Sequence, residues 1–135
     1  MISPVVFLTA YRTEPARLLM LVRRIAAEDK DAFTRLYDAL LPEVSETIRG
    51  RLANASRADE IAAATFVEAW QEADLHTGPG TDVAAWIRGI AERRATEPDD
   101  PRRGAHPARS RHGAGVALGA LLGRRPPRRA AGRRR

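Results

Sequence analysis

Residues Asp59–Leu75 read DEIAAATFVEAWQEADL, and the organisation of the chain can be worked out from this segment. At about 100° per residue, its large apolar side chains fall on one side of a helix. Phe66 and Trp70 are four residues apart and are therefore neighbours on that surface. We predict that this side faces the core. It consists of Ile61, Ala62, Thr65, Phe66, Ala69, Trp70 and Ala73.

The opposite side of the same helix combines small apolar residues with polar and acidic ones. Small side chains let a second helix approach closely, whereas charged helix faces usually contact solvent. Two interpretations therefore stay open: a solvated face, or a docking surface for a partner helix. This side consists of Glu60, Ala63, Ala64, Val67, Glu68, Gln71 and Asp74.

Three further helices are predicted around this segment, and no stretch alternates as a strand would. Apolar residues recur at helical spacing over about 14–27, over about 31–52, and again after the loop His76–Thr81. Pro42 is expected to bend or restart the second of these helices. The sequence thus predicts an all-α bundle of about four helices. We expect N-caps at Asp29 or Asp31, at Ser56, and at Thr81 or Asp82.

Charge is segregated along the 135 residues. Residues 1–97 hold 12 basic and 15 acidic residues, a net charge of −3. Residues 98–135 hold 11 arginines and two aspartates, a net charge of +9, together with five prolines and six glycines. Such a composition is typical of disordered chains. We therefore predict a lead-in at 1–13, a helical domain at 14–97 and a disordered basic tail at 98–135.

The residue inventory argues against catalysis, metal binding and membrane insertion. The chain has no cysteine, so disulfides and thiolate metal sites are excluded. Its three histidines are scattered, and it has neither a nucleophile motif nor a glycine-rich phosphate loop. The apolar run Val116–Leu122 is far shorter than the ~20 residues that span a bilayer. We predict a cytoplasmic protein with no enzyme activity, cofactor, metal, membrane contact or small-molecule substrate.

Three segments, in order, resemble the region-2 domain of an extracytoplasmic-function sigma factor of bacterial RNA polymerase. In Leu18–Val44 an acidic turn precedes AFTRLY, as in the opening helices of that domain. Ala58–Trp70 reads ADEIAAATFVEAW and resembles the helix that binds the polymerase clamp. Ala84–Glu97 reads AAWIRGIAERRATE and resembles the promoter-reading helix. The resemblance covers about the first 97 residues and implies a transcription initiation protein.

The resemblance also implies two partners, core RNA polymerase and promoter DNA. The clamp helices of the polymerase would bind the outer side of Asp59–Leu75, through Glu60, Ala63, Ala64, Val67, Glu68 and Gln71. The loop His76–Thr81 and the following helix would hold the melted minus-ten element, whose bases are read singly. Candidate phosphate and base contacts are Arg88, Arg93 and Arg94, for which the alternative is solvated helix surface.

Other residues qualify this assignment. Trp86 is spaced with Val83 and Ile90, so we expect a buried anchor rather than a stacking platform. Ala63 and Ala64 stand where the family commonly has a Gln-Glu pair, which removes hydrogen bonds worth about 0.5–1.5 kcal/mol each. Glu92 stands where a basic residue is common, and a carboxylate opposes phosphate binding.

These departures support a rival hypothesis. In that hypothesis the protein is a non-initiating interaction module, a decoy for polymerase or for an anti-sigma factor. A sigma factor of this family would continue into a second helical domain, region 4, which the residues after Glu97 do not resemble. The arginine-rich tail also resembles GC-rich DNA read in a shifted frame. A truncated or frameshifted gene is therefore a further open interpretation of the tail.

Overall fold

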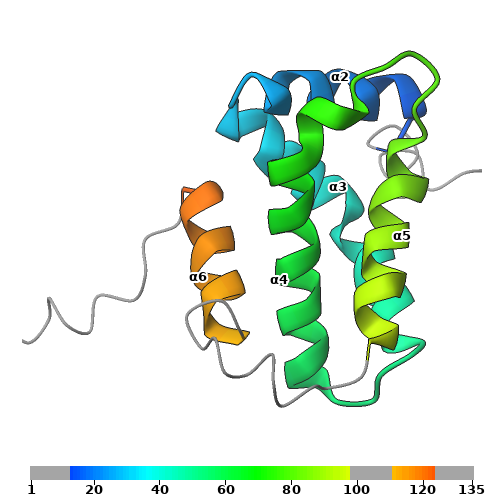
Figure 1. Cartoon of the computed structure of the whole chain (residues 1–135), viewed down its shortest axis with the longest axis vertical. Helices are drawn as coiled ribbons and strands as arrows, with labels where there is room; N and C mark the ends of the chain where they lie inside the picture. The colour runs from blue at the N-terminus through cyan, green and yellow to red at the C-terminus, as the bar shows by residue number, and fades with distance from the viewer. Residues whose placement is uncertain (1–12, 98–110, 124–135) are drawn as a thin grey trace, which may run out of the picture.

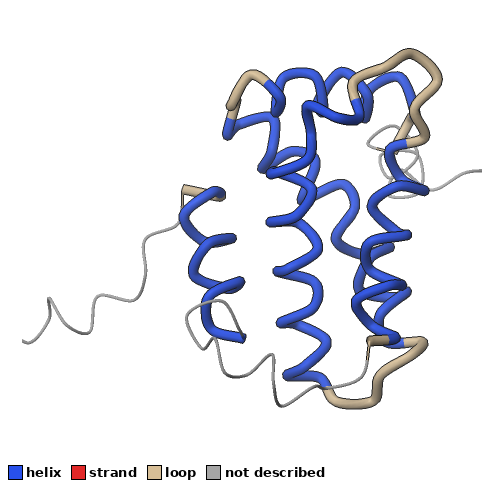
Figure 2. Tube along the Cα trace, viewed as in Figure 1, coloured by secondary structure: helices blue, strands red, loops and turns tan. Residues whose placement is uncertain are grey.

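The computed structural model describes residues 13–97 and 111–123, and these residues form helices with no β-strand among them (Figure 2). α2 lies across one end of the bundle, while α5 and α6 run along either side of α4 (Figure 1). The predicted all-α fold is confirmed. The elements in order are α2 (Pro15–Ala26), α3 (Lys30–Arg49), α4 (Ala55–Glu72), the 3₁₀-helix η1 (Ala73–His76), α5 (Val83–Thr96) and α6 (Arg111–Leu121).

Two of the predicted N-caps are confirmed. Asp29 accepts a hydrogen bond from the Ala32 N–H at 3.1 Å, and Asp82 accepts one from the Ala85 N–H at 3.0 Å. Each bond satisfies an N–H that has no partner within its own helix. The Ala32 N–H, followed by the Arg24 side chain, holds the pKa of Asp29 below its usual value. These caps set where α3 and α5 begin.

Helix α4 begins earlier than predicted and ends in a tighter turn. Asn54 accepts a hydrogen bond from the Arg57 N–H at 3.0 Å, so it caps the helix in place of Ser56. Asparagine is as good an N-cap as serine, and Ala58 in the first turn of the helix is buried. The other end continues as η1, where Leu75 is 73% exposed.

Helix α3 is continuous through Pro42 rather than restarting there. Leu40, Val44 and Ile48 all remain on one buried stripe, so packing holds the helix on both sides of the proline. Pro42 and Asp38 lie on the exposed side. Water can therefore replace the backbone hydrogen bond that proline cannot donate.

Aromatic side chains fill the contact between α3 and α4. Phe33 and Phe66 are fully buried. Tyr37 meets Phe66 edge-on with ring centroids 4.9 Å apart, and Trp70 meets Phe33 in the same way at 5.5 Å. Such edge-to-face pairs add about 0.5–1.5 kcal/mol to the burial of the rings. The predicted core side of α4 is confirmed, although Trp70 is only partly buried.

Helix α6 lies in the stretch that the sequence analysis assigned to a disordered tail. Leu118 is 9% exposed, and Ala114, Leu121 and Leu122 pack against the core cluster. The expectation of disorder does not hold for this segment, because α4 offers its apolar residues a surface to cover. Gly123, at φ 74°, follows the helix in the left-handed conformation typical of helix ends.

The remainder of the predicted tail, and the lead-in apart from Thr13, fall outside the described residues. Within the described ranges, no helix is both long and apolar enough to cross a membrane.

Candidate functional site

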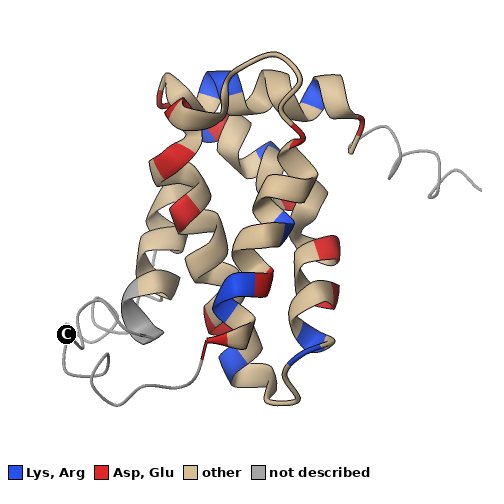
Figure 3. Cartoon of the chain, turned by 45° about the vertical axis from the view of Figure 1, so that its right-hand side comes forward, with Lys and Arg blue, Asp and Glu red and all other residues tan. Residues whose placement is uncertain are grey.

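One flank of the predicted outer surface of α4 faces α5 through a single carboxylate. The Glu68 side chain is 12% exposed, its Oε1 accepts a hydrogen bond from Arg94 Nε at 2.9 Å, and its Oε2 pairs with Arg93. A carboxylate bound by two guanidinium groups is a strong, charge-assisted arrangement. Figure 3 shows acidic and basic residues side by side on these helices. Glu68 therefore holds α5 against α4 and is committed to contacts within the chain.

The other flank of α4 is covered by α6. Ala63 is 6% exposed, and Val67 is partly buried against the core cluster. Both residues lie about 100–140° around the helix from Glu68, on the part of α4 that is turned away from that carboxylate, and α6 packs on α4 on the side opposite α5 (Figure 1). The prediction that Ala63 faces outward is wrong, because Ala63 is buried.

Between the two flanks lies the accessible strip of α4, which consists of Glu60, Ala64 and Gln71. Gln71 is exposed, and Glu60 and Ala64 are partly exposed. The three positions fall within about 40° of one another around the helix. The surface predicted as continuous is thus divided into an α5 flank, the accessible strip and an α6 flank.

All three arginines predicted to contact DNA have carboxylate partners. Arg88 Nη1 lies 2.7 Å from Glu43 Oε2 on α3, and Arg93 and Arg94 share Glu68. The side chains of Arg88 and Glu43 are 42% and 38% exposed, and such surface pairs contribute only about 0–1 kcal/mol. A phosphate can therefore take the place of the Glu43 carboxylate at little cost.

A fourth ion pair changes the interpretation of Glu92 as an unbalanced negative charge. Its Oε2 lies 3.6 Å from Arg51 Nη2, and both side chains are more than 40% exposed. Sequence reasoning treated Glu92 as an unbalanced negative charge on the promoter-reading helix. Arg51, which lies just beyond the end of α3, balances part of that charge.

The loop between η1 and α5 is held from two sides. The Thr81 N–H and hydroxyl donate to the Gly78 carbonyl at 3.2 and 2.7 Å. Gly80, at φ 85°, supplies the left-handed residue that a type II turn requires. Arg23 Nε donates to the Thr77 carbonyl at 2.9 Å and ties the loop to α2. The loop is thereby positioned at the start of α5.

Trp86 of α5 contacts His76, the residue that directly precedes this loop. Its indole stacks on the His76 ring, with centroids 3.9 Å apart and planes 17° from parallel. The expected burial of Trp86 is only partial, because one side of the indole is covered by His76 rather than by the core. An aromatic pair thus lies at the loop end of the arginine-bearing helix.

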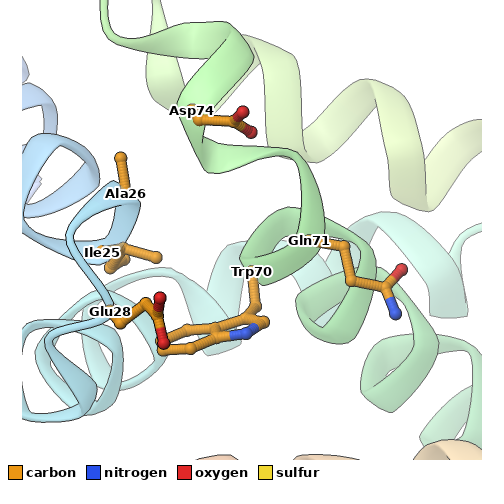
Figure 4. Close-up of a pocket in the computed structure, with 6 residues that line it drawn as sticks. All are labelled: Ile25, Ala26, Glu28, Trp70, Gln71 and Asp74. Carbon is orange, nitrogen blue, oxygen red and sulfur yellow. The ribbon is translucent and has the colours of Figure 1, made fainter.

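An open groove of about 340 Å³ lies between the ends of α2 and α4 (Figure 4). Its walls carry an indole and two carboxylates, those of Glu28 and Asp74. The described residues contain no group of three or more metal-ligating side chains, here or elsewhere. We assign no ligand to this groove, which is lined by Ile25, Ala26, Glu28, Trp70, Gln71 and Asp74.

The model of the protein family described as sigma-70 region 2 matches residues 36–97 of the chain. The match runs from α3 to the end of α5 and so includes α4, the loop and the three arginines. Residues 36–97 are a sigma-70 region 2 domain. The resemblance inferred from the three sequence segments is thereby confirmed, and the divided surface of α4 belongs to this region 2 domain.

Curated relatives of the region 2 domain are extracytoplasmic-function (ECF) sigma factors. The chain is 34% identical over 79 residues to the ECF RNA polymerase sigma factor BldN of Streptomyces coelicolor, covering 58% of this chain and 30% of that protein. It is 28% identical over 109 residues to the ECF RNA polymerase sigma factor SigK of Mycobacterium sp. (strain KMS), covering 76% of this chain and 56% of that protein. It therefore spans less than two thirds of either relative. No solved structure gives a significant match.

Helix α6 is the part of the site that sequence reasoning missed. The available signal was that residues 114–123 contain no charged or polar side chain. Gly113, Gly115 and Gly119 obscured that signal, because each glycine disfavours a helix by about 1 kcal/mol relative to alanine.

Proposed function

We propose that the region 2 domain acts in transcription initiation. In this proposal α4 binds the clamp helices of core RNA polymerase, and the loop 76–81 with α5 contacts the minus-ten promoter element. The observation that carries the proposal is a single family match, residues 36–97, that contains α4, the loop and α5 together. The ECF sigma factor relatives support it. Such a protein acts in the cytoplasm, has no catalytic role and needs no cofactor.

The accessible strip of α4 is the proposed first contact with polymerase. Ala64 is small enough to let a partner helix approach, and the flanking Glu60 and Gln71 can form polar contacts at its edges. Ala63, Val67 and Glu68 belong to the same proposed surface. In the free chain, however, Ala63 is buried, Val67 is partly buried and Glu68 is bound to α5.

The proposed DNA contact lies at α5 and the loop before it. Arg88, Arg93 and Arg94 would exchange carboxylate partners for phosphates of the melted strand, and surface ion pairs are weak enough to be exchanged. The exchange is easiest at Arg88, because Arg93 and Arg94 share the nearly buried Glu68. The aromatic pair of His76 and Trp86 marks the end of the site at which an unstacked base would meet a ring.

Substitution in the accessible strip tests the polymerase contact. Ala64→Arg should weaken binding to core polymerase by at least tenfold, because a long charged side chain blocks close helix packing. The thermal unfolding midpoint should stay within a few degrees, since Ala64 is partly exposed and arginine favours helices. The measurement is affinity for purified core polymerase.

A matched control adds the same charge elsewhere. Ala16 is exposed on α2, and Ala16→Arg should leave polymerase affinity unchanged. If Ala64→Arg binds as tightly as the unmodified protein, the polymerase contact does not use α4 as proposed.

A second candidate function is a non-initiating interaction module that occupies polymerase or an anti-sigma factor. The pairing of every candidate DNA-contacting arginine with a carboxylate, and the presence of Glu92 on α5, favour this candidate. Transcription with core polymerase and a promoter library separates the two functions. Polymerase binding without promoter-dependent transcripts would support the second candidate.

A further inference from the structure

Helix α6 occupies a surface that the proposed function requires. It packs on α4 on the side opposite α5 (Figure 1). Ala63 is buried and Val67 is partly buried on the part of α4 turned away from Glu68, so we infer that α6 covers these two of the six residues in the proposed polymerase-binding surface. Leu118 of α6 is 9% exposed, and α6 contacts α4 and, to a lesser extent, α3. A partner helix cannot pack against the same flank while α6 is there, because core-like packing leaves no space for both.

We propose that α6 is an intramolecular competitor that covers the polymerase-binding surface of α4 in the free protein and leaves it when polymerase binds. This inference rests on the proposed function. It assigns to residues 111–121 a regulatory role that the region 2 match at 36–97 does not include. The occupant that displaces α6 is a helix of the polymerase clamp.

The composition of α6 makes it a weak helix on its own. It has 11 residues, fewer than the ~12–15 that even good helix formers need in water. Gly113, Gly115 and Gly119 each disfavour the helix relative to alanine. The helix therefore depends on its contact with α4. Losing that contact should unwind it rather than leave a free helix in solution.

The chemistry of the contact also permits release. Residues 114–123 have no polar or charged side chain, so departure of α6 leaves no charge or hydrogen-bonding side chain of those residues unpaired. Because α6 belongs to the same chain, its rebinding to α4 is intramolecular and needs no bimolecular encounter. The covered state is therefore favoured until a competitor binds. The measured polymerase affinity then equals the intrinsic affinity multiplied by the fraction of uncovered molecules.

The experiment compares two substitutions on α6, in the full chain. Leu118→Arg places a charge in the α4 contact and should uncover the surface, because Leu118 is 9% exposed. Val116→Arg adds the same charge at a position that is 73% exposed. We expect about tenfold tighter binding to core polymerase for Leu118→Arg, since burial of a leucine is worth at least that factor, and no change for Val116→Arg.

Two further measurements keep the result interpretable. Gly119→Pro breaks α6 without adding charge and should tighten binding as Leu118→Arg does. Amide hydrogen exchange should show residues 114–122 protected in the free protein and unprotected in the polymerase complex. Circular dichroism of each variant is the control, and it should show that the remaining helices persist.

The outcomes separate this inference from the proposed function. Equal or weaker polymerase binding by Leu118→Arg and Gly119→Pro would overturn the inference, and so would continued protection of residues 114–122 in the complex. If no version of the chain binds polymerase, the proposed function fails and the competitor role fails with it. Exchange protection in the free protein would then still report whether α6 covers α4.

Discussion

Helices α5 and α6 pack on either side of α4 (Figure 1), and both bury apolar side chains, but α5 is also held by charged contacts. Glu68 of α4 binds two arginines of α5, and Arg57 donates to the Glu97 carbonyl at 3.3 Å. Residues 114–121 of α6 have no polar side chain, so apolar burial alone holds their side chains on the bundle. Removing α5 would leave a nearly buried carboxylate without its cations, whereas removing residues 114–121 takes away no charged or hydrogen-bonding side chain.

This difference separates a permanent neighbour of α4 from an exchangeable one. Charged hydrogen bonds are directional, and the loss of one partner leaves the other poorly solvated. Apolar burial has no direction and accepts any apolar surface of suitable shape. We therefore expect the α5 flank to be part of the fold and propose the α6 flank as the one that a partner helix can occupy.

The largest effect is expected at the support that the two flanks share. Phe66 is fully buried in the centre of α4, and Phe66→Ala should lower the free energy of unfolding by about 3–5 kcal/mol. Both α5 and α6 should lose exchange protection, because both pack on α4. Leu75→Ala is the control, since Leu75 is 73% exposed and should change stability by less than about 0.5 kcal/mol. A small effect of Phe66→Ala would show that α4 is not this common support.

A smaller and more selective effect is expected from the ion pairs. Glu68→Gln should lower the free energy of unfolding by about 1.5–3 kcal/mol, the usual contribution of hydrogen bonds to charged groups. Protection of residues 114–122 should be unchanged, because Glu68 faces α5. Glu92→Gln removes a longer, more exposed ion pair and should lower stability by no more than about 1 kcal/mol. Equal effects of the two substitutions in denaturant unfolding would contradict the assigned role of Glu68.

The smallest effect comes from a matched pair of glycines. Gly89 in α5 and Gly115 in α6 are both exposed, and an added Cβ would meet nothing within 4 Å at either position. Substitution by alanine should stabilise each helix by about 0.5–1 kcal/mol. Gly89→Ala should raise the global free energy of unfolding. Gly115→Ala should raise only the exchange protection of α6, by roughly two- to fivefold at that energy.

This glycine pair also tests the division between the flanks directly. If Gly115→Ala raises global stability as much as Gly89→Ala does, α6 unfolds together with the bundle. It would then be a fixed part of the fold, and the two flanks would not differ as described.

Sequence reasoning succeeded wherever the determining contacts are local or follow helical spacing. The core side of α4 follows from apolar residues recurring every three to four positions, and Asp29 and Asp82 cap helices because each side chain reaches its own first turn. Small errors arose where two local signals compete, as at Asn54 and Ser56. Continuity through Pro42 was missed because its cause, the buried stripe on both sides, lies in packing.

By itself the sequence determined an all-α region 2 domain, its core and the order of its candidate binding segments. Only the tertiary structure decided which of those segments are available. Ala63 is buried although helical spacing placed it on the outer side, and Glu68 faces arginines 25 and 26 positions away. Helical periodicity records which side of a helix is apolar, but it carries no information about which distant segment packs there. The accessibility of α4 therefore depends on long-range packing.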